Sequence, residues 1–304
     1  MADKNPFMCD YDAGLCGVGP KSVEKITPTS IKEESPLRVV YYTDPICSAC
    51  WAIEGALRKL RLEYGHEFVF DCHMGGLLPA FGKGYDPGDF YKPEDLAKHW
   101  DEASAQFRVP INGNVWLKDP LSSSFPPSIA FKAAQLQSEV KAEALLRLLR
   151  EKLFVQSLNV SENSIILEAA EEVGLDVVKL KEDIKGEGNI NFHHDLELGE
   201  ELGIRGFPTF LFFNLEGDHR VLFGVHPYPD YEKYILKLNP KAVKASYDKD
   251  PLALLKRFGS LTVKELSVLA EYGYYEAEQD LDKLEKEGRA KVVVSPNGKL
   301  WKLI

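Results

Sequence analysis

The order of apolar and polar positions predicts two strands joined by a helix. Residues 37–43 form an apolar, strand-like run, and 67–74 form a second one. Between them, apolar residues recur at helical spacing from about 48 to 64, and Gly65 stands where a helix would end. A helix of this length between two apolar strands is typical of a βαβ unit, so we expect the strands to be parallel and buried.

A helical block follows the second predicted strand. The chain is rich in Gly and Pro from 76 to 92, and no convincing strand occurs between about 93 and 202. Helices are expected at 93–107, 126–138, 139–154, 161–173, 176–185 and 189–202. Strands return at 206–214 and 219–224, followed by a helix at 229–238. The pattern predicts an α/β domain formed by 37–75 and 204–238, with a helical insertion at 76–203.

The segments on either side of this domain have different patterns. Residues 1–36 carry several Gly and Pro and little periodicity, which predicts an irregular arm. Residues 239–250 are polar, as a linker would be. For 251–304 we expect three helices, the second with a capping box, and a terminal hairpin that turns at Asn297-Gly298. This module resembles a winged helix.

The charge of the third helix in this module argues against DNA binding. It carries six acidic residues against two lysines, whereas attraction to DNA requires neutralisation of phosphates. We therefore expect the module to pack against the rest of the chain or to bind a protein.

Composition narrows the class of protein further. The chain has 304 residues, 44% hydrophobic and 28% charged, which is ordinary for a globular protein. A net charge of −10 disfavours nucleic acid and anionic membranes as partners. The first residues are polar with no apolar stretch behind them, and no run is long enough to span a membrane. We expect a cytoplasmic protein, and an odd number of cysteines, five, fits a reducing compartment.

Cys47 and Cys50 form a CxxC motif between the first strand and the first helix. A cysteine at a helix N-terminus is stabilised as the thiolate by unpaired N–H groups and the helix dipole. The second cysteine is one turn away and can resolve a mixed disulfide. The alternative is half of a zinc site, but no second CxxC or His pair follows at the usual spacing, so we expect no metal.

The motifs together resemble the DsbA-like branch of the thioredoxin fold. The resemblance rests on Cys47-Ser48-Ala49-Cys50 after the first strand, Gly206-Phe207-Pro208-Thr209 before the third, and the helical insertion. The segments 74–79, 112–117, 119–124 and 129–134 are similar to FrnE-like dithiol-disulfide isomerases. They also resemble the adaptor family that delivers the Spx regulator to the ClpXP protease.

This resemblance implies roles for particular residues. Cys47 would be the attacking thiolate and Cys50 the resolving thiol, with no cofactor. Pro208 would be a cis-proline that turns the Phe207 backbone toward an extended substrate peptide. Thr209 and Trp51 would complete the substrate-binding residues. Phe207 is bulkier than the residue that many relatives carry before the proline.

The remaining cysteines and histidines have weaker signals. Cys9 and Cys16 could close a small disulfide loop, bind a metal with other ligands, or remain as two unpaired surface thiols. Cys72 falls within a predicted strand, where a buried, inert thiol is expected. His193 and His194 lie beside Asp195 on a predicted helix, and we expect a solvated polar face there.

Two functions from different classes follow. The first is a cytoplasmic thiol–disulfide oxidoreductase or isomerase that acts on protein or peptide substrates, favoured by the intact CxxC and the 74–79 segment. The alternative is a non-catalytic adaptor that presents a regulator to the ClpXP protease, favoured by the C-terminal module. A kappa-type glutathione transferase is disfavoured, because those enzymes rely on a serine where Cys47 stands.

Overall fold

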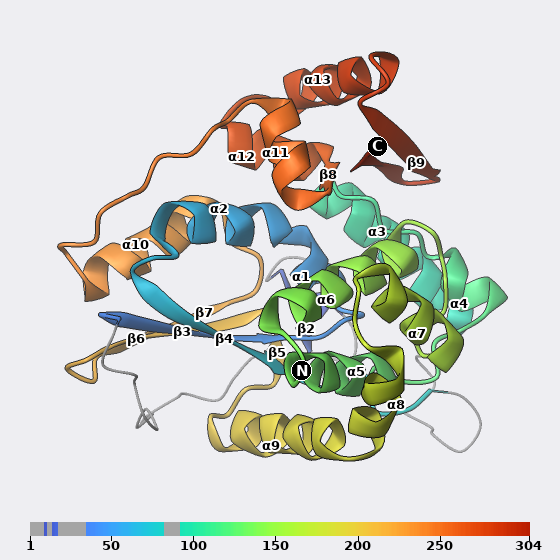
Figure 1. Cartoon of the computed structure of the whole chain (residues 1–304), viewed down its shortest axis with the longest axis horizontal. Coiled ribbons are helices and arrows are strands. Elements are labelled where there is room, and N and C mark those ends of the chain that lie inside the picture. The colour runs from blue at the N-terminus through green and yellow to red at the C-terminus, as the bar shows by residue number, and fades with distance from the viewer. Residues whose placement is uncertain (1–8, 11–13, 18–34, 82–91) are drawn as a thin grey trace.

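A four-stranded mixed sheet forms the centre of the first domain (Figure 1). The computed structural model describes residues 9–10, 14–17, 35–81 and 92–304. Strands β3 (Leu37–Thr43) and β4 (Phe68–Met74) are parallel and are joined by helices α1 (Ser48–Ala52) and α2 (Glu54–Tyr64). The predicted βαβ unit is confirmed. The expectation of full burial is wrong for β4, which is a half-buried edge strand in the order β4-β3-β6-β7.

Seven helices lie between β4 and the next strand in the described part of the chain. They are α3 (Pro93–Phe107), α4 (Asn114–Lys118), α5 (Phe125–Gln135), α6 (Glu139–Phe154), α7 (Asn163–Glu172), α8 (Val177–Lys185) and α9 (Glu187–Glu201). The six expected helices are present, with ends that differ by a few residues. The short α4 was not predicted, because a helix of five residues carries too little periodicity to be recognised.

The chain then returns to the sheet. It forms β5 (Gly206–Phe207), β6 (Thr209–Asn214), β7 (His219–Phe223) and α10 (Tyr228–Leu238). The single strand expected at 206–214 is divided at Pro208, which donates no backbone hydrogen bond. Strand β6 is antiparallel to both β3 and β7.

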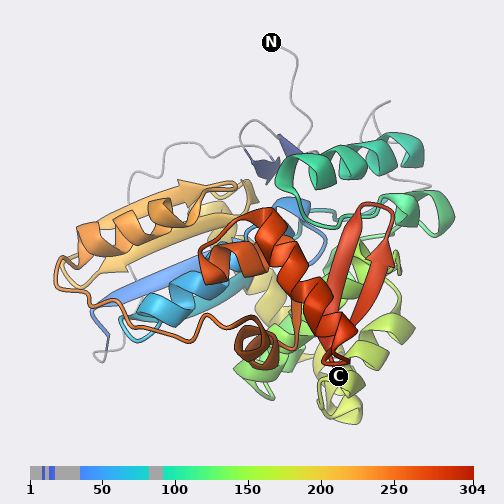
Figure 2. The same ribbon diagram turned by 90° about the horizontal axis from the view of Figure 1, so that it is seen from above.

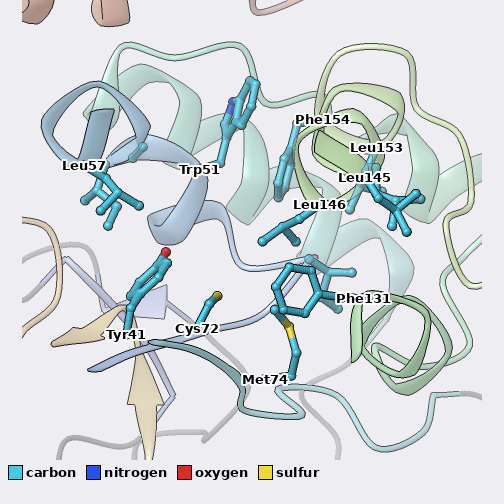
Figure 3. Packing of buried hydrophobic residues seen from close by; sticks show 14 of the residues in the cluster. Tyr41, Trp51, Leu57, Cys72, Met74, Phe131, Leu145, Leu146, Leu153 and Phe154 are labelled. Atoms are coloured by element: carbon cyan, nitrogen blue, oxygen red, sulfur yellow. The ribbon is translucent and has the colours of Figure 1, made fainter. Parts of the chain in front are cut away.

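Helices cover both faces of the sheet. Figure 1 shows α2 and α10 on one side of it and α9 on the other, with the insertion beside it. One large apolar cluster runs from the sheet into the insertion, where Trp51 meets Phe154 and Met74 approaches Phe131 (Figure 3). The domain and its insertion therefore share one core.

The sequence predicts an irregular N-terminal arm, but parts of this arm form regular structure. Cys9–Asp10 (β1) and Leu15–Gly17 (β2) form a short antiparallel pair, and β2 also pairs with β5. These strands are two and three residues long, too short for a period of two to be seen in the sequence.

The C-terminal segment forms a small unit that lies against α2 (Figure 2). Its elements are α11 (Pro251–Phe258), β8 (Ser260–Thr262), α12 (Val263–Ala270), α13 (Tyr274–Lys286), β9 (Ala290–Ser295) and β10 (Gly298–Leu303). The capping box of α12, between Thr262 and Glu265, is confirmed. Strand β8, which completes the sheet β8-β10-β9, was not predicted. The three helices and the hairpin are present, and the name winged helix stays a prediction.

Buried ion pairs fasten this unit to the first domain. Arg147 of α6 contacts Glu265 of α12 at 2.6 Å and Glu151 at 2.9 Å, and its guanidinium lies 4.3 Å from the ring centre of Trp51. Arg58 of α2 also reaches Glu265, at 3.2 Å. Burial raises the pKa of Glu265, but Arg147 and Arg58 outweigh it and lower the pKa overall. The buried carboxylate of Glu265 depends on its ion-pair partners, because an unpaired buried ion destabilises the folded state.

The substitution Glu265→Gln tests this junction. It keeps an acceptor for the Thr262 N–H, which the Glu265 side chain binds at 2.7 Å, but removes the carboxylate that Arg147 and Arg58 share. We expect unfolding by urea to show a loss of about 3 kcal/mol, as for other broken buried pairs. The matched control, Glu278→Gln, removes a half-exposed partner of Lys299 and should cost less than about 1 kcal/mol. Equal losses in the two variants would contradict this account.

Candidate functional site

The two cysteines of the CxxC motif lie at the start of α1, which follows β3. Cys47 is the N-cap residue of α1, and its Sγ accepts a hydrogen bond from the Cys50 N–H at 3.2 Å. Both thiols are free and fully buried. The turn before them is closed by the Cys47 N–H, which donates to the Asp44 carbonyl at 3.2 Å. The sequence thus places a dithiol where a backbone N–H of the helix start donates to one sulfur.

The loop that carries Pro208 faces this dithiol. The Phe207–Pro208 peptide bond is cis, as the resemblance implies. The Cys47 thiol points at the Phe207 carbonyl, with sulfur and oxygen 3.7 Å apart. Thr209 holds the loop, because its hydroxyl donates to the Gly206 carbonyl at 2.7 Å. The loop and the motif therefore form one site.

The bulky Phe207 fits because its neighbour has no side chain. A Cβ on Gly75 would lie 1.8 Å from the Phe207 ring, so only glycine leaves room for it. Gly75 directly follows β4, and its N–H donates to the Thr43 carbonyl at 2.8 Å. The large Phe207 side chain before the proline is thus accommodated by the absence of a side chain at Gly75.

Burial acts against a free thiolate at Cys47. It raises the pKa of Cys47, and the nearby Cys50 and Asp44 raise it further. Burial also raises the pKa of Cys50, but the hydrogen bond with Cys47 and the charge of Arg150 outweigh it and lower the pKa overall. The two thiols titrate as a pair rather than independently.

Two charged residues that sequence analysis did not single out approach the dithiol. Arg150 of α6 is almost fully buried and binds Thr43 Oγ1 at 2.6 Å, the Asp44 carbonyl at 3.2 Å and Glu54 at 2.5 Å. Asp44 is buried as well, and its carboxylate accepts from the N–H groups of Leu77 and Ile46.

The carboxyl of Asp44 is hard to ionise. Burial raises its pKa to about 6, although its hydrogen bonds and Arg150 pull in the other direction. The position of Asp44, three residues before Cys47, was the available signal in the sequence. A carboxylate there is placed to influence the charge of the thiols.

A third missed residue lies on α9. Asp195 is buried, and its carboxylate contacts His73 Nδ1 at 2.6 Å, the Met74 N–H at 2.8 Å and Lys132 at 3.0 Å. The expectation of a solvated polar face holds for the exposed His193 and His194 but is wrong for Asp195. A single acidic residue within a polar run gives no sequence signal of burial. Asp195 ties the insertion to the end of β4, next to Gly75.

Trp51 lies in the hydrophobic core, away from the loop that faces the dithiol. Its indole N–H donates to the Pro110 carbonyl at 3.0 Å, and its ring stacks with Phe154. Trp51 packs among aromatic rings of the insertion and Arg147, and its expected contact with substrate stays a prediction.

The other two positions considered in the sequence are also accounted for. Cys72 is a buried free thiol whose pKa burial raises, as expected of an inert cysteine. Cys16 is disulfide-bonded and fully buried, which rules out an unpaired surface thiol there. Its Sγ lies 3.7 Å from Ser48 Oγ, at the first residue of α1. The arm therefore reaches the dithiol.

Comparison with known proteins agrees with this geometry. Residues 41–233 match the model of a family described as thioredoxin. The chain is 31% identical to the ClpXP adapter protein SpxH of Halalkalibacterium halodurans, over 99% of this chain and 98% of that one. It is 27% identical to SpxH of Bacillus subtilis, over 88% and 90% of the two chains.

Solved structures share the fold over part of the chain. A probable DsbA oxidoreductase from Streptomyces coelicolor is 15% identical, with a TM-score of 0.52, and the match covers 70% of this chain and 94% of that one. The cytosolic disulfide reductase DsbM from Pseudomonas aeruginosa is 21% identical, with a TM-score of 0.50, covering 67% and 98%. At this identity the likeness shows the fold alone. Among the described helices, none is long and apolar enough to cross a membrane.

The substitution Asp44→Asn tests the electrostatics of the site. Because an ionised Asp44 raises the pKa of Cys47, we expect Cys47 to react with iodoacetamide faster in the variant, by roughly threefold to tenfold at pH 7. The wild-type rate profile should show an inflection near pH 6 that the variant lacks. Asp71→Asn, on the neighbouring strand, serves as the control and should leave the profile unchanged.

The free energy of unfolding should also depend on the ionisation of Asp44. The pKa of Asp44 is raised in the folded chain, so its contribution to stability is present below about pH 4 and is lost as the pH rises through about 6. Urea unfolding at several pH values measures this loss. A wild-type chain whose stability and thiol reactivity show no change near pH 6 would contradict the assigned pKa.

Proposed function

The chain belongs to the thioredoxin family, and from that premise we propose that it acts as an adaptor that presents a protein regulator to a ClpXP-type protease. The extent of the similarity carries the proposal. The relative named as a ClpXP adapter matches 99% of this chain, including the C-terminal unit. The oxidoreductase structures match only 67% and 70% of it.

The junction between the two parts supports this function. An adaptor must hold its binding surfaces in a fixed arrangement, and here Glu265 of the C-terminal unit is fixed by Arg147 and Arg58 of the first domain. The burial of Cys47 and Cys50 also fits a protein that does not depend on rapid turnover at its dithiol.

A second function, thiol–disulfide exchange with protein thiols, is favoured by a specific observation. Both cysteines of the motif are free, Cys47 caps a helix, and a cis-proline lies opposite. This is the set of groups that exchange requires. The dithiol would serve as a redox-sensitive element of the adaptor, or act on substrates of its own.

A reconstituted degradation assay tests the adaptor. Spx and ClpXP from Bacillus subtilis are mixed with the full chain, and loss of Spx is followed by gel. We expect the chain to accelerate degradation by about tenfold or more, since tethering raises the effective concentration of the regulator at the protease. The Cys47→Ser, Cys50→Ser double variant should keep most of this effect. No acceleration by the wild-type chain, together with no binding of Spx, would sink the proposal.

An insulin-reduction assay tests the second function. Because Cys47 is fully buried, we expect wild-type turnover to be slow compared with thioredoxin, and Cys47→Ser to abolish it. Cys72→Ser removes a buried thiol outside the motif and should leave the rate unchanged. Activity that survives Cys47→Ser would show that the motif is not responsible.

A further inference from the structure

The N-terminal arm occupies the edge at which an extended peptide would pair with the cis-proline loop. Strand β2 is antiparallel to β5, with Cys16 opposite Phe207 and Gly17 opposite Gly206. Gly206 and Phe207 are the two residues that precede Pro208, at the cis bond. Pairing with a free strand edge is a general way to bind an extended peptide. In this chain, the peptide on that edge is the chain's own.

The arm also brings a disulfide to the dithiol. Cys16 is disulfide-bonded, whereas Cys47 and Cys50 are free thiols. All three are fully buried and belong to the same apolar cluster, and Cys16 Sγ lies 3.7 Å from Ser48 Oγ, next to Cys47 in the sequence. An oxidised sulfur, that of Cys16, therefore shares a buried site with the two free thiols.

A close contact holds the arm in this position. Gly14 has φ +59°, its carbonyl accepts a hydrogen bond from the Val225 N–H at 2.6 Å, and a Cβ added to it would lie 2.8 Å from both the nitrogen and the Cβ of Val225. Only glycine suits both the backbone angle and the space. Gly14, two residues before Cys16, therefore packs closely against the segment that follows β7.

We propose that the arm is an intramolecular substrate of the CxxC pair, and that Cys47 exchanges with the disulfide of Cys16. This inference rests on the thiol chemistry of the second proposed function and gives it a substrate within the chain. The adaptor function does not depend on it.

The exchange balances without an outside oxidant. The Cys47 thiol loses its proton and attacks Sγ of Cys16, which forms a Cys47–Cys16 bond and releases the other sulfur of the arm disulfide as a thiolate that takes up a proton. Cys50 then loses its proton and attacks Cys47, and Cys16 leaves and is protonated. Two electrons pass from the CxxC dithiol to the arm. The arm ends as a dithiol and the motif as a disulfide.

The geometry favours the internal partner over an external one. Cys47 is fully buried, so a dissolved disulfide reaches it only after the residues around it have moved, whereas Cys16 already belongs to the same buried cluster. Holding two reactants together in this way replaces a bimolecular collision by an intramolecular step. The Cys50 N–H at Cys47 Sγ stabilises the attacking sulfur as the thiolate forms.

Trapping of the mixed disulfide in the full-length chain tests the proposal. In a Cys50→Ser variant the intermediate cannot be resolved, so a Cys47–Cys16 bond should accumulate in air-oxidised protein without any added substrate. Acid quenching, alkylation and digestion with trypsin and Asp-N are followed by mass spectrometry. Asp-N cuts before Asp10 and Asp12 and so separates Cys9 from Cys16.

Two glycine variants show whether position is responsible. Adding Gly14→Val to the Cys50→Ser chain should displace the arm and lower the yield of the mixed disulfide by about tenfold, because proximity is lost while every reacting cysteine remains. Adding Gly273→Val is the control, because a Cβ there meets nothing within 4 Å, and the yield should not change.

The outcomes separate this inference from the proposed functions. A Cys50→Ser chain in which Cys47 stays a free thiol and Cys16 keeps its original partner overturns the inference. If the wild-type chain nevertheless reduces insulin, the second proposed function stands and only the inference of an internal substrate is overturned. An equal yield with and without Gly14→Val would also overturn it, because the bond would then form without the docked arm.

Discussion

A run of buried charges from α6 to α12 is the interaction on which the rest of the structure depends. Arg147 binds Glu265 and Glu151, and Arg150 binds Glu54, all at 2.5 to 2.9 Å and all nearly shielded from water. Removing one of these charges leaves the remaining buried ions incompletely paired, which costs several kcal/mol. The C-terminal unit is therefore fixed to the insertion and to α2 by electrostatics as well as by apolar contact.

These charges also set the environment of the dithiol. The guanidinium of Arg150 lowers the pKa of Cys50, and that of Arg147 lies against Trp51, the residue after it. Arg150 therefore lies beside the dithiol, and Arg147, three residues earlier on the same helix, binds Glu265 of the C-terminal unit. One helix carries both contacts.

The sequence predicts the elements whose apolar residues recur at a regular spacing over several residues. Strand 37–43 and the helix after it follow from periodicity, and the cis bond at Pro208 follows from the resemblance. The burial of Asp44, Arg150 and Asp195 could not be predicted, because each depends on a partner more than thirty residues away, such as Leu77 for Asp44. The packing around Trp51 could not be predicted for the same reason: its contacts Pro110 and Phe154 come from the insertion.

The arm is the most instructive of these differences, because its low periodicity hid a specific contact. A three-residue strand gives no pattern, and the fit of Gly14 against Val225 is visible only once both are placed. Its position reconciles two properties that otherwise conflict, an intact CxxC beside a cis-proline and a Cys47 that solvent does not reach. In the exchange proposed above, the docked strand supplies a disulfide within the chain, so Cys47 meets an intramolecular partner before a dissolved one. A complete exchange site can therefore be kept while burial shields it from dissolved disulfides.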